Sequence, residues 1–185
     1  MRAKIDQTTL ELVKGDITLQ DTDAIVNAAN STLLGGGGVD GSIHRAAGPR
    51  LLAETRALGG CDTGDAKITR GYDLKARYVI HAVGPVYRPN SREVAALLSS
   101  AYRRSLEVAA ENGLKTVAFP AISTGIYGYP LEEAAPIALQ TILDYAAANS
   151  QLELVRFVLF DDDAYDAFAG ALKMLAAKEG HLRLE

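Results

Sequence analysis

Four consecutive glycines, Gly35–Gly38, are the feature that most constrains the fold of this chain. They follow a short, apolar, β-branched segment at residues 24–28, which is typical of a strand buried on both faces. Residues 39–58 then carry apolar side chains at helical spacing, with a turn near Gly48–Pro49. A glycine run loses much backbone entropy on folding and adds no packing, so it indicates a loop whose main chain approaches a ligand closely. A flexible turn is the alternative interpretation.

The rest of the chain continues the alternation of strands and helices. We predict further strands at residues 9–13, 65–72, 78–83, 116–122 and 154–160, the last being the final strand, and helices at 92–111, 130–149 and from the acidic residues 161–163 to about 178. Pro136 is expected to kink or restart its helix. No linker or repeat divides the chain, so the pattern predicts one α/β domain over residues 1–185, with a mostly parallel sheet covered on both faces.

Composition limits the partners of such a domain. With 185 residues, 48% of them hydrophobic, the chain can bury a substantial core. Its net charge of -4 argues against a protein that binds nucleic acid by neutralising phosphates, whereas main-chain amides can still bind a small anion. Cys61 is the only cysteine, which excludes an internal disulfide and a cysteine-based zinc site. The first residues lack the apolar stretch of a secretory signal, and no run is long enough to span a membrane, so a cytoplasmic location is expected.

Ligands of parallel sheets bind beyond the carboxyl ends of the strands, so the loops that leave strands are the informative ones. Here they are residues 15–16, 27–40, 123–128 and 160–161. Gly36–Gly41 matches the spacing of a dinucleotide-binding fingerprint, but the glycines do not follow the strand directly and the expected later acid is missing. A P-loop is excluded because no Gly-Lys-Ser/Thr follows. The glycines therefore predict a diphosphate-binding loop of another type.

Two motifs about ninety residues apart resemble one family. Asn30, six intervening residues and then Gly37-Gly38-Val39-Asp40 look like the signature of MacroD-type macrodomains, and Gly125-Ile126-Tyr127-Gly128 looks like their second loop. Further similarity covers residues 15–17, 43–49, 61–66, 81–85 and 119–125, and it is closest to bacterial O-acetyl-ADP-ribose deacetylases. The resemblance implies a three-layer α/β/α macrodomain with a central mixed, mostly parallel sheet that binds ADP-ribose or O-acetyl-ADP-ribose.

The resemblance also implies how the adenine end is held. The Asp16 carboxylate would accept from the adenine amine, the Ile17 amide would donate to the ring, and Phe160 would stack on it. From local sequence alone, Asp16 is more typical of a helix cap, and Phe160 at a strand end is more typical of a core residue.

The remaining substrate-binding residues surround the diphosphate and the distal ribose. By the resemblance, main-chain amides of both loops hold the diphosphate, Tyr127 packs on the distal ribose, and Asn27 lies near that sugar. The hydroxyls of the second loop can donate hydrogen bonds. The expected set is Asn27, Gly37, Gly38, Val39, Ser123, Thr124, Gly125, Ile126 and Tyr127.

Asn30 and Asp40 are the candidate catalytic residues. The resemblance implies that Asn30 positions the distal ribose and that Asp40 orients or activates water, although a turn residue and a helix cap are the simpler interpretations. His44 would share a helix face with Asp40, either as a structural histidine or as a group that tunes it. The three histidines lack metal-ligand spacing, and Ser123 is not in a G-x-S-x-G elbow, so neither a metal, a cofactor nor a serine nucleophile is expected.

The expected reaction is hydrolysis of an ester on the distal ribose. The ester is either the acetyl group of O-acetyl-ADP-ribose or the link to Asp or Glu of a mono-ADP-ribosylated protein. Water attacks without a covalent enzyme intermediate, and either Asp40 or the substrate diphosphate takes its proton. The rival hypothesis is a non-catalytic reader of ADP-ribose, and an RNA-binding or regulatory protein is disfavoured by the acidic composition.

Overall fold

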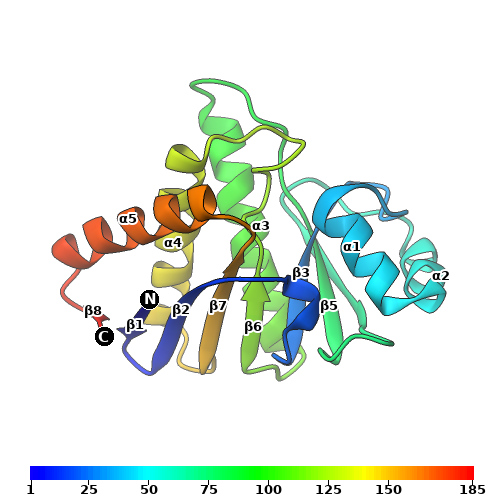
Figure 1. Ribbon diagram of the computed structural model, residues 1–185, viewed down its shortest axis with the longest axis horizontal. Coiled ribbons are helices and arrows are strands. Elements are labelled where there is room, and N and C mark those ends of the chain that lie inside the picture. Colours follow the sequence, from blue (N-terminus) through cyan, green and yellow to red (C-terminus); the bar gives the residue numbers. More distant parts are fainter.

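The computed structural model describes residues 1–185 and contains one sheet of eight strands in the order β4-β5-β3-β6-β7-β2-β1-β8 (Figure 1). The strands are β1 (Arg2–Ile5), β2 (Thr8–Lys14), β3 (Ala24–Ala29), β4 (Ala66–Arg70), β5 (Tyr78–Val83), β6 (Thr116–Phe119), β7 (Leu154–Leu159) and β8 (Leu182–Leu184). The five central strands run parallel, whereas β4 pairs antiparallel with β5 and β1 pairs antiparallel with β2. The predicted mixed, mostly parallel sheet is confirmed.

Helices cover both faces of the sheet. They are α1 (Gly38–Ala47), α2 (Pro49–Leu58), α3 (Arg92–Glu111), α4 (Leu131–Ala148) and α5 (Asp162–Lys178), with one 3₁₀ turn, η1 (Ile17–Leu19). Alternate residues of a strand point to opposite faces. In β3, Val26 joins the large core under α3, α4 and α5, whereas Ile25 joins a smaller core under α1. The chain therefore forms the three predicted layers.

Two predicted details differ in the structure. The helix α4 does not restart at Pro136, because this residue lies on an exposed turn where the carbonyl of exposed Glu132 loses only one main-chain donor. The segment ending at residue 160 is not the last strand, because the short β8 pairs with β1 at the sheet edge. Neither β1 nor β8 was predicted, since segments of three or four residues show too little alternation to be recognised.

The parallel strands bring the candidate loops to one edge of the sheet. The segments after β2, β3, β6 and β7 all leave carboxyl ends of neighbouring parallel strands. Figure 1 shows these connections along the upper edge, between α5 and α1. None of the helices combines the length and apolar character required to cross a membrane.

Candidate functional site

The glycine loop carries a row of unpaired main-chain donors. The amides from Gly35 to Asp40 donate to no acceptor within the protein, and α1 begins inside this row with no side-chain cap. Gly38 has φ 57°, a left-handed conformation that favours glycine. Free amides and the positive end of the helix dipole attract anions. The loop is therefore built to bind an anionic group through its backbone.

The second loop, residues 123–128, lies against the first. A Cβ on Gly37 would lie 3.5 Å from Cδ1 of Ile126, so the two loops lie next to each other. The Tyr87 amide donates to the Tyr127 carbonyl at 2.9 Å, which fixes the second loop from outside. The amides of Gly125, Ile126 and Tyr127 have no acceptor in the protein. Both loops therefore offer main-chain donors at one place.

The hydroxyls of the second loop are arranged differently from the prediction. The Ser123 residue has φ 67° and is buried, and its Oγ lacks a hydrogen-bond partner. This Oγ packs on Gly84, where an added Cβ would overlap it. Thr124 Oγ1 donates to the Ala121 carbonyl at 2.8 Å. One hydroxyl is buried and the other donates within a turn, so neither is a free donor; the unpaired donors of this loop are the amides of residues 125–127.

Asp16 and Phe160 lie side by side at the ends of β2 and β7, whose register pairs Lys14 with Leu159. Asp16 caps η1: its Oδ1 accepts from Thr18 N at 2.9 Å and from Thr18 Oγ1 at 2.7 Å. The Ile17 amide has no acceptor in the protein. Phe160 is 87% exposed, so it is not a core residue. An exposed aromatic ring beside a capped turn can pack on a flat ligand group.

Asn30 shapes the glycine loop. Its Oδ1 accepts from Thr32 N at 3.1 Å and from Thr32 Oγ1 at 2.6 Å, and its Nδ2 donates to the Gly35 carbonyl at 2.9 Å. Asn30 therefore acts as a turn residue that holds the start of the glycine loop.

Asp40 lies in the first turn of α1 and is only 5% exposed. Its Oδ1 accepts from Asn27 Nδ2 at 2.8 Å and lies 3.4 Å from His44 Nε2, one turn along the predicted helix face. Its Oδ2 lies toward Gly36, where an added Cβ would be 3.1 Å from this oxygen and 3.3 Å from Asn30 Nδ2. The two candidate catalytic side chains therefore both border Gly36 of the glycine loop.

A buried row of polar side chains continues from Asp40 across the sheet. Asn27 Nδ2 lies 3.1 Å from His81 Nδ1, and His81 Nε2 lies 2.9 Å from Thr69 Oγ1. Burial, with a smaller effect of His44, lowers the pKa of His81 to about 3, so its ring is neutral. Neither His81 nor Thr69 can be recognised as a site residue from the sequence, because their contacts depend on the pairing of Asn27 with His81 across β3 and β5.

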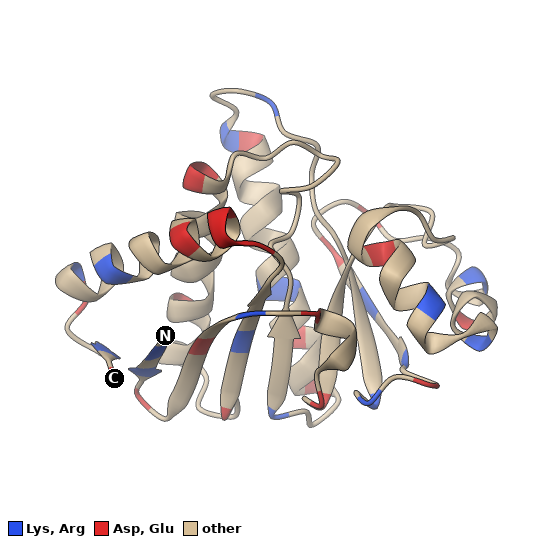
Figure 2. Cartoon of the chain, viewed as in Figure 1, with Lys and Arg blue, Asp and Glu red and all other residues tan.

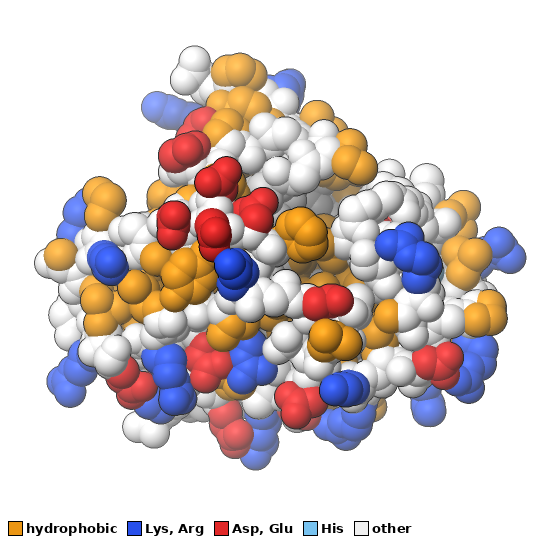
Figure 3. Space-filling view, viewed as in Figure 1, with side chains coloured by type: hydrophobic (Ala, Val, Ile, Leu, Met, Phe, Trp, Pro, Cys, Tyr) orange, Lys and Arg blue, Asp and Glu red, His pale blue; other side chains and the backbone are white.

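The charges around the site do not explain attraction of an anion. Neither glycine loop contains Lys or Arg, and the exposed carboxylates of Asp161, Asp162 and Asp163 gather at the start of α5 (Figure 2). Asp161 caps that helix, accepting from Ala164 N at 2.9 Å, and Asp162 pairs with Lys14 at 2.7 Å. Figure 3 shows this face hollowed between the acidic side chains and the α1 side. Main-chain donors must therefore hold any bound phosphate.

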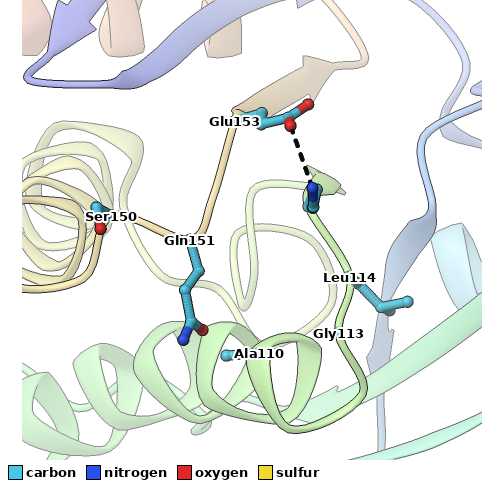
Figure 4. Close-up of a pocket in the computed structure, with 7 residues that line it drawn as sticks. Ala110, Gly113, Leu114, Ser150, Gln151 and Glu153 are labelled. Atoms are coloured by element: carbon cyan, nitrogen blue, oxygen red, sulfur yellow. Dashed lines mark ion pairs between the residues drawn. The ribbon is translucent and has the colours of Figure 1, made fainter.

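Other features of the molecule lie outside this chemistry. A hollow of about 470 Å³, lined in part by Gly113 and Gln151, lies at the amino ends of β6 and β7, and an ion pair of Lys115 and Glu153 at 3.7 Å spans it (Figure 4). It lies at the sheet edge opposite the candidate site. Burial raises the pKa of the Cys61 thiol to about 11, so this cysteine is not an activated nucleophile. No group of three or more His, Cys, Asp or Glu side chains could hold a metal ion.

The sequence of this chain is similar to those of known proteins. The family model described as the Macro domain matches residues 26–138. A macro domain-containing protein of Chlorobaculum tepidum is 54% identical over 90% of this chain and 97% of its own length. The human ADP-ribose glycohydrolase MACROD2 is 58% identical over 82% of this chain, which corresponds to 36% of that longer protein.

Solved structures show the same fold. The Oceanobacillus iheyensis macrodomain with ADP superposes with a TM-score of 0.93 at 45% identity, covering 97% of both chains. The Trypanosoma brucei macrodomain in complex with ADP-ribose has a TM-score of 0.83 at 44% identity, covering 88% of this chain and 68% of that one.

Proposed function

Because this chain belongs to the Macro domain family, we propose that it binds ADP-ribose across the carboxyl ends of its parallel strands and hydrolyses an ester on the distal ribose. One observation carries the proposal: unpaired amides of two loops converge beside the buried carboxylate of Asp40. The amides form a site for a diphosphate, and the Asp40 carboxylate lies close enough to act on the distal ribose that the diphosphate carries.

The ligand lies along the sheet edge in this proposal. Adenine packs on Phe160 and its polar edge meets Asp16 and the Ile17 amide. The diphosphate accepts from the amides of Gly37, Gly38 and Val39 and from those of residues 125–127. The distal ribose then lies over Asn30 and Asp40, with Tyr127 beside it. Related macrodomains of Oceanobacillus iheyensis and Trypanosoma brucei have been solved with ADP and with ADP-ribose, which supports this class of ligand.

The proposed reaction is attack of water on the acyl carbon of the ester. The bond from that carbon to the ribose oxygen breaks, which yields a carboxylic acid and a free ribose hydroxyl. Oδ2 of Asp40 holds the water, since Oδ1 already accepts from Asn27. The name ADP-ribose glycohydrolase of the relative MACROD2 supports a hydrolase. The substrate is O-acetyl-ADP-ribose or a mono-ADP-ribosylated Asp or Glu of a protein.

Turnover assays on both substrates test the proposal. Wild-type protein should release acetate from O-acetyl-ADP-ribose or ADP-ribose from a modified glutamate peptide. Asp40→Ala should lower kcat by about 100-fold or more, because positioned acid–base groups contribute on that order. Its affinity for ADP-ribose should change by less than about 5-fold, since the carboxylate acts on the attacking water.

Two further variants sharpen the assay. Asp40→Asn keeps a polar group that can orient water but cannot take its proton, so retention of most turnover would assign the proton to the diphosphate. Asp144→Asn removes an exposed carboxylate of α4 and should behave as wild type. Binding of ADP-ribose without turnover of either ester would instead identify a non-catalytic reader.

A further inference from the structure

Four polar side chains from four different elements form one buried row on the α1 side of the sheet. Asp40 comes from α1, Asn27 from β3, His81 from β5 and Thr69 from β4. Three contacts of 2.8, 3.1 and 2.9 Å join them in that order. Asn27 and His81 are wholly buried, and Thr69 is 2% exposed. Only the Asp40 end of the row reaches the candidate site.

The hydrogen-bond pattern determines where each proton lies. The Thr69 hydroxyl donates to the Arg70 carbonyl at 3.1 Å, so its oxygen accepts from His81 Nε2. The neutral ring then carries its proton on Nε2 and accepts at Nδ1. Asn27 must therefore present its NH₂ group, which has two hydrogens: one for His81 Nδ1 and one for Asp40 Oδ1. Donation therefore runs outward from the Asn27 amide, to the Asp40 carboxylate on one side and through His81 and Thr69 to the Arg70 carbonyl on the other.

We propose that His81, oriented by Thr69, is a positioning residue that fixes the amide of Asn27 and through it the carboxylate of Asp40. This inference rests on the proposed hydrolytic function, because it assigns a purpose to the orientation of Asp40. With Oδ1 held by Asn27, Oδ2 is the oxygen left facing Gly36 and Asn30. The substrate does not contact His81.

The hydrogen bond to His81 keeps the side-chain amide of Asn27 from turning over. Asn27 Oδ1 is buried without a partner, so the amide has no second anchor. Without the acceptor on His81, the amide could turn and bring this oxygen toward the Asp40 carboxylate, where two acceptors repel each other. Burial keeps the pKa of His81 low, which prevents a second ring proton from forcing the same turn.

Substitutions at His81 test the inference. His81→Leu removes the acceptor but keeps an apolar side chain of moderate size. Its kcat should fall by about 10-fold, because the variant loses one buried hydrogen bond that orients the Asp40 carboxylate. KM and the Kd for ADP-ribose should change by less than about 3-fold. His81→Asn places an amide oxygen near the position of Nδ1, so it should recover kcat to within about 3-fold of wild type. Both variants are expected to be less stable than wild type.

A second pair of variants keeps the histidine. Thr69→Val removes the acceptor of the Nε2 proton and should lower kcat about 3-fold, with an unchanged Kd. Thr141→Val is the matched control, because it also removes a buried hydroxyl but lies in α4 on the other face of the sheet. It should lose stability without losing kcat. Wild-type kcat in His81→Leu, or an equal loss in His81→Asn and in His81→Leu, would overturn the inference.

Nuclear magnetic resonance separates failure of this inference from failure of the proposed function. Long-range ¹H–¹⁵N correlations of labelled wild-type protein should show His81 as the Nε2–H tautomer, and Asp40→Ala should shift the Asn27 side-chain resonances. These signals do not require turnover. An Nδ1–H tautomer, or Asn27 resonances that ignore Asp40→Ala, would refute the row even if the protein is an active hydrolase.

Discussion

Phe160→Ala should separate ligand affinity from stability. The ring is 87% exposed and follows the last residue of β7, so little of its surface is buried on folding. Truncation at an exposed site typically changes the free energy of unfolding by less than about 0.5 kcal/mol. Stacking of an aromatic side chain on a base is worth about 1–3 kcal/mol by alanine substitution. A loss of about 2 kcal/mol would raise the Kd for ADP-ribose about 30-fold.

Phe157→Ala, within β7 and three residues before Phe160, is the matched control. Phe157 is wholly buried, and its ring centroid lies 5.0 Å from that of Phe168 and 5.6 Å from that of Phe119. Removing such a ring leaves a cavity and should lower the free energy of unfolding by about 3–5 kcal/mol. The two phenylalanines, three residues apart, should therefore show opposite behaviour.

Titration calorimetry with ADP-ribose and denaturant unfolding measure both quantities. Phe160→Trp should restore affinity because it keeps a flat aromatic face. An unchanged Kd in Phe160→Ala would remove this residue from the adenine site. A loss of stability comparable to that of Phe157→Ala would contradict the reasoning from exposure.

Two further predictions concern buried polar groups. Ser123→Ala should leave the free energy of unfolding unchanged or raise it by up to about 1 kcal/mol, because Oγ has no hydrogen-bond partner to lose. It should also leave the affinity for ADP-ribose unchanged. Weaker binding in calorimetry would mean that the hydroxyl turns toward the ligand. Burial holds the pKa of His81 in the folded protein at about 3, below the ordinary value of 6.5. Between these two pH values the unfolded state binds more protons than the folded state. The free energy of unfolding therefore falls as the pH falls through that range. The slope from this group is about 1.4 kcal/mol per pH unit, and denaturant midpoints of His81→Leu should depend less steeply on pH than those of wild type.

Secondary structure could be predicted from the sequence where the pattern of residues was pronounced. The apolar run that became β3, the glycine run, and the long amphipathic segment of α3 were all predicted close to their observed bounds. The sequence also predicted that the two glycine-containing loops lie at the same edge of the sheet, because both leave parallel strands. In contrast, local sequence predicted a core position for Phe160, whereas the end of β7 at Leu159 leaves its ring exposed.

The amino-acid order by itself determined the α/β class, the glycine-rich loops and the absence of cations within them, since these depend on nearest neighbours and on residue type. Tertiary structure alone decided that Asn27 joins His81 and Thr69 behind Asp40, and that the Ser123 hydroxyl turns inward. The first depends on the register of β3, β5 and β4, which is set by the packing of whole faces of the sheet rather than by any short segment. The second depends on the close packing of Ser123 against Gly84, which lies about forty residues earlier in the chain.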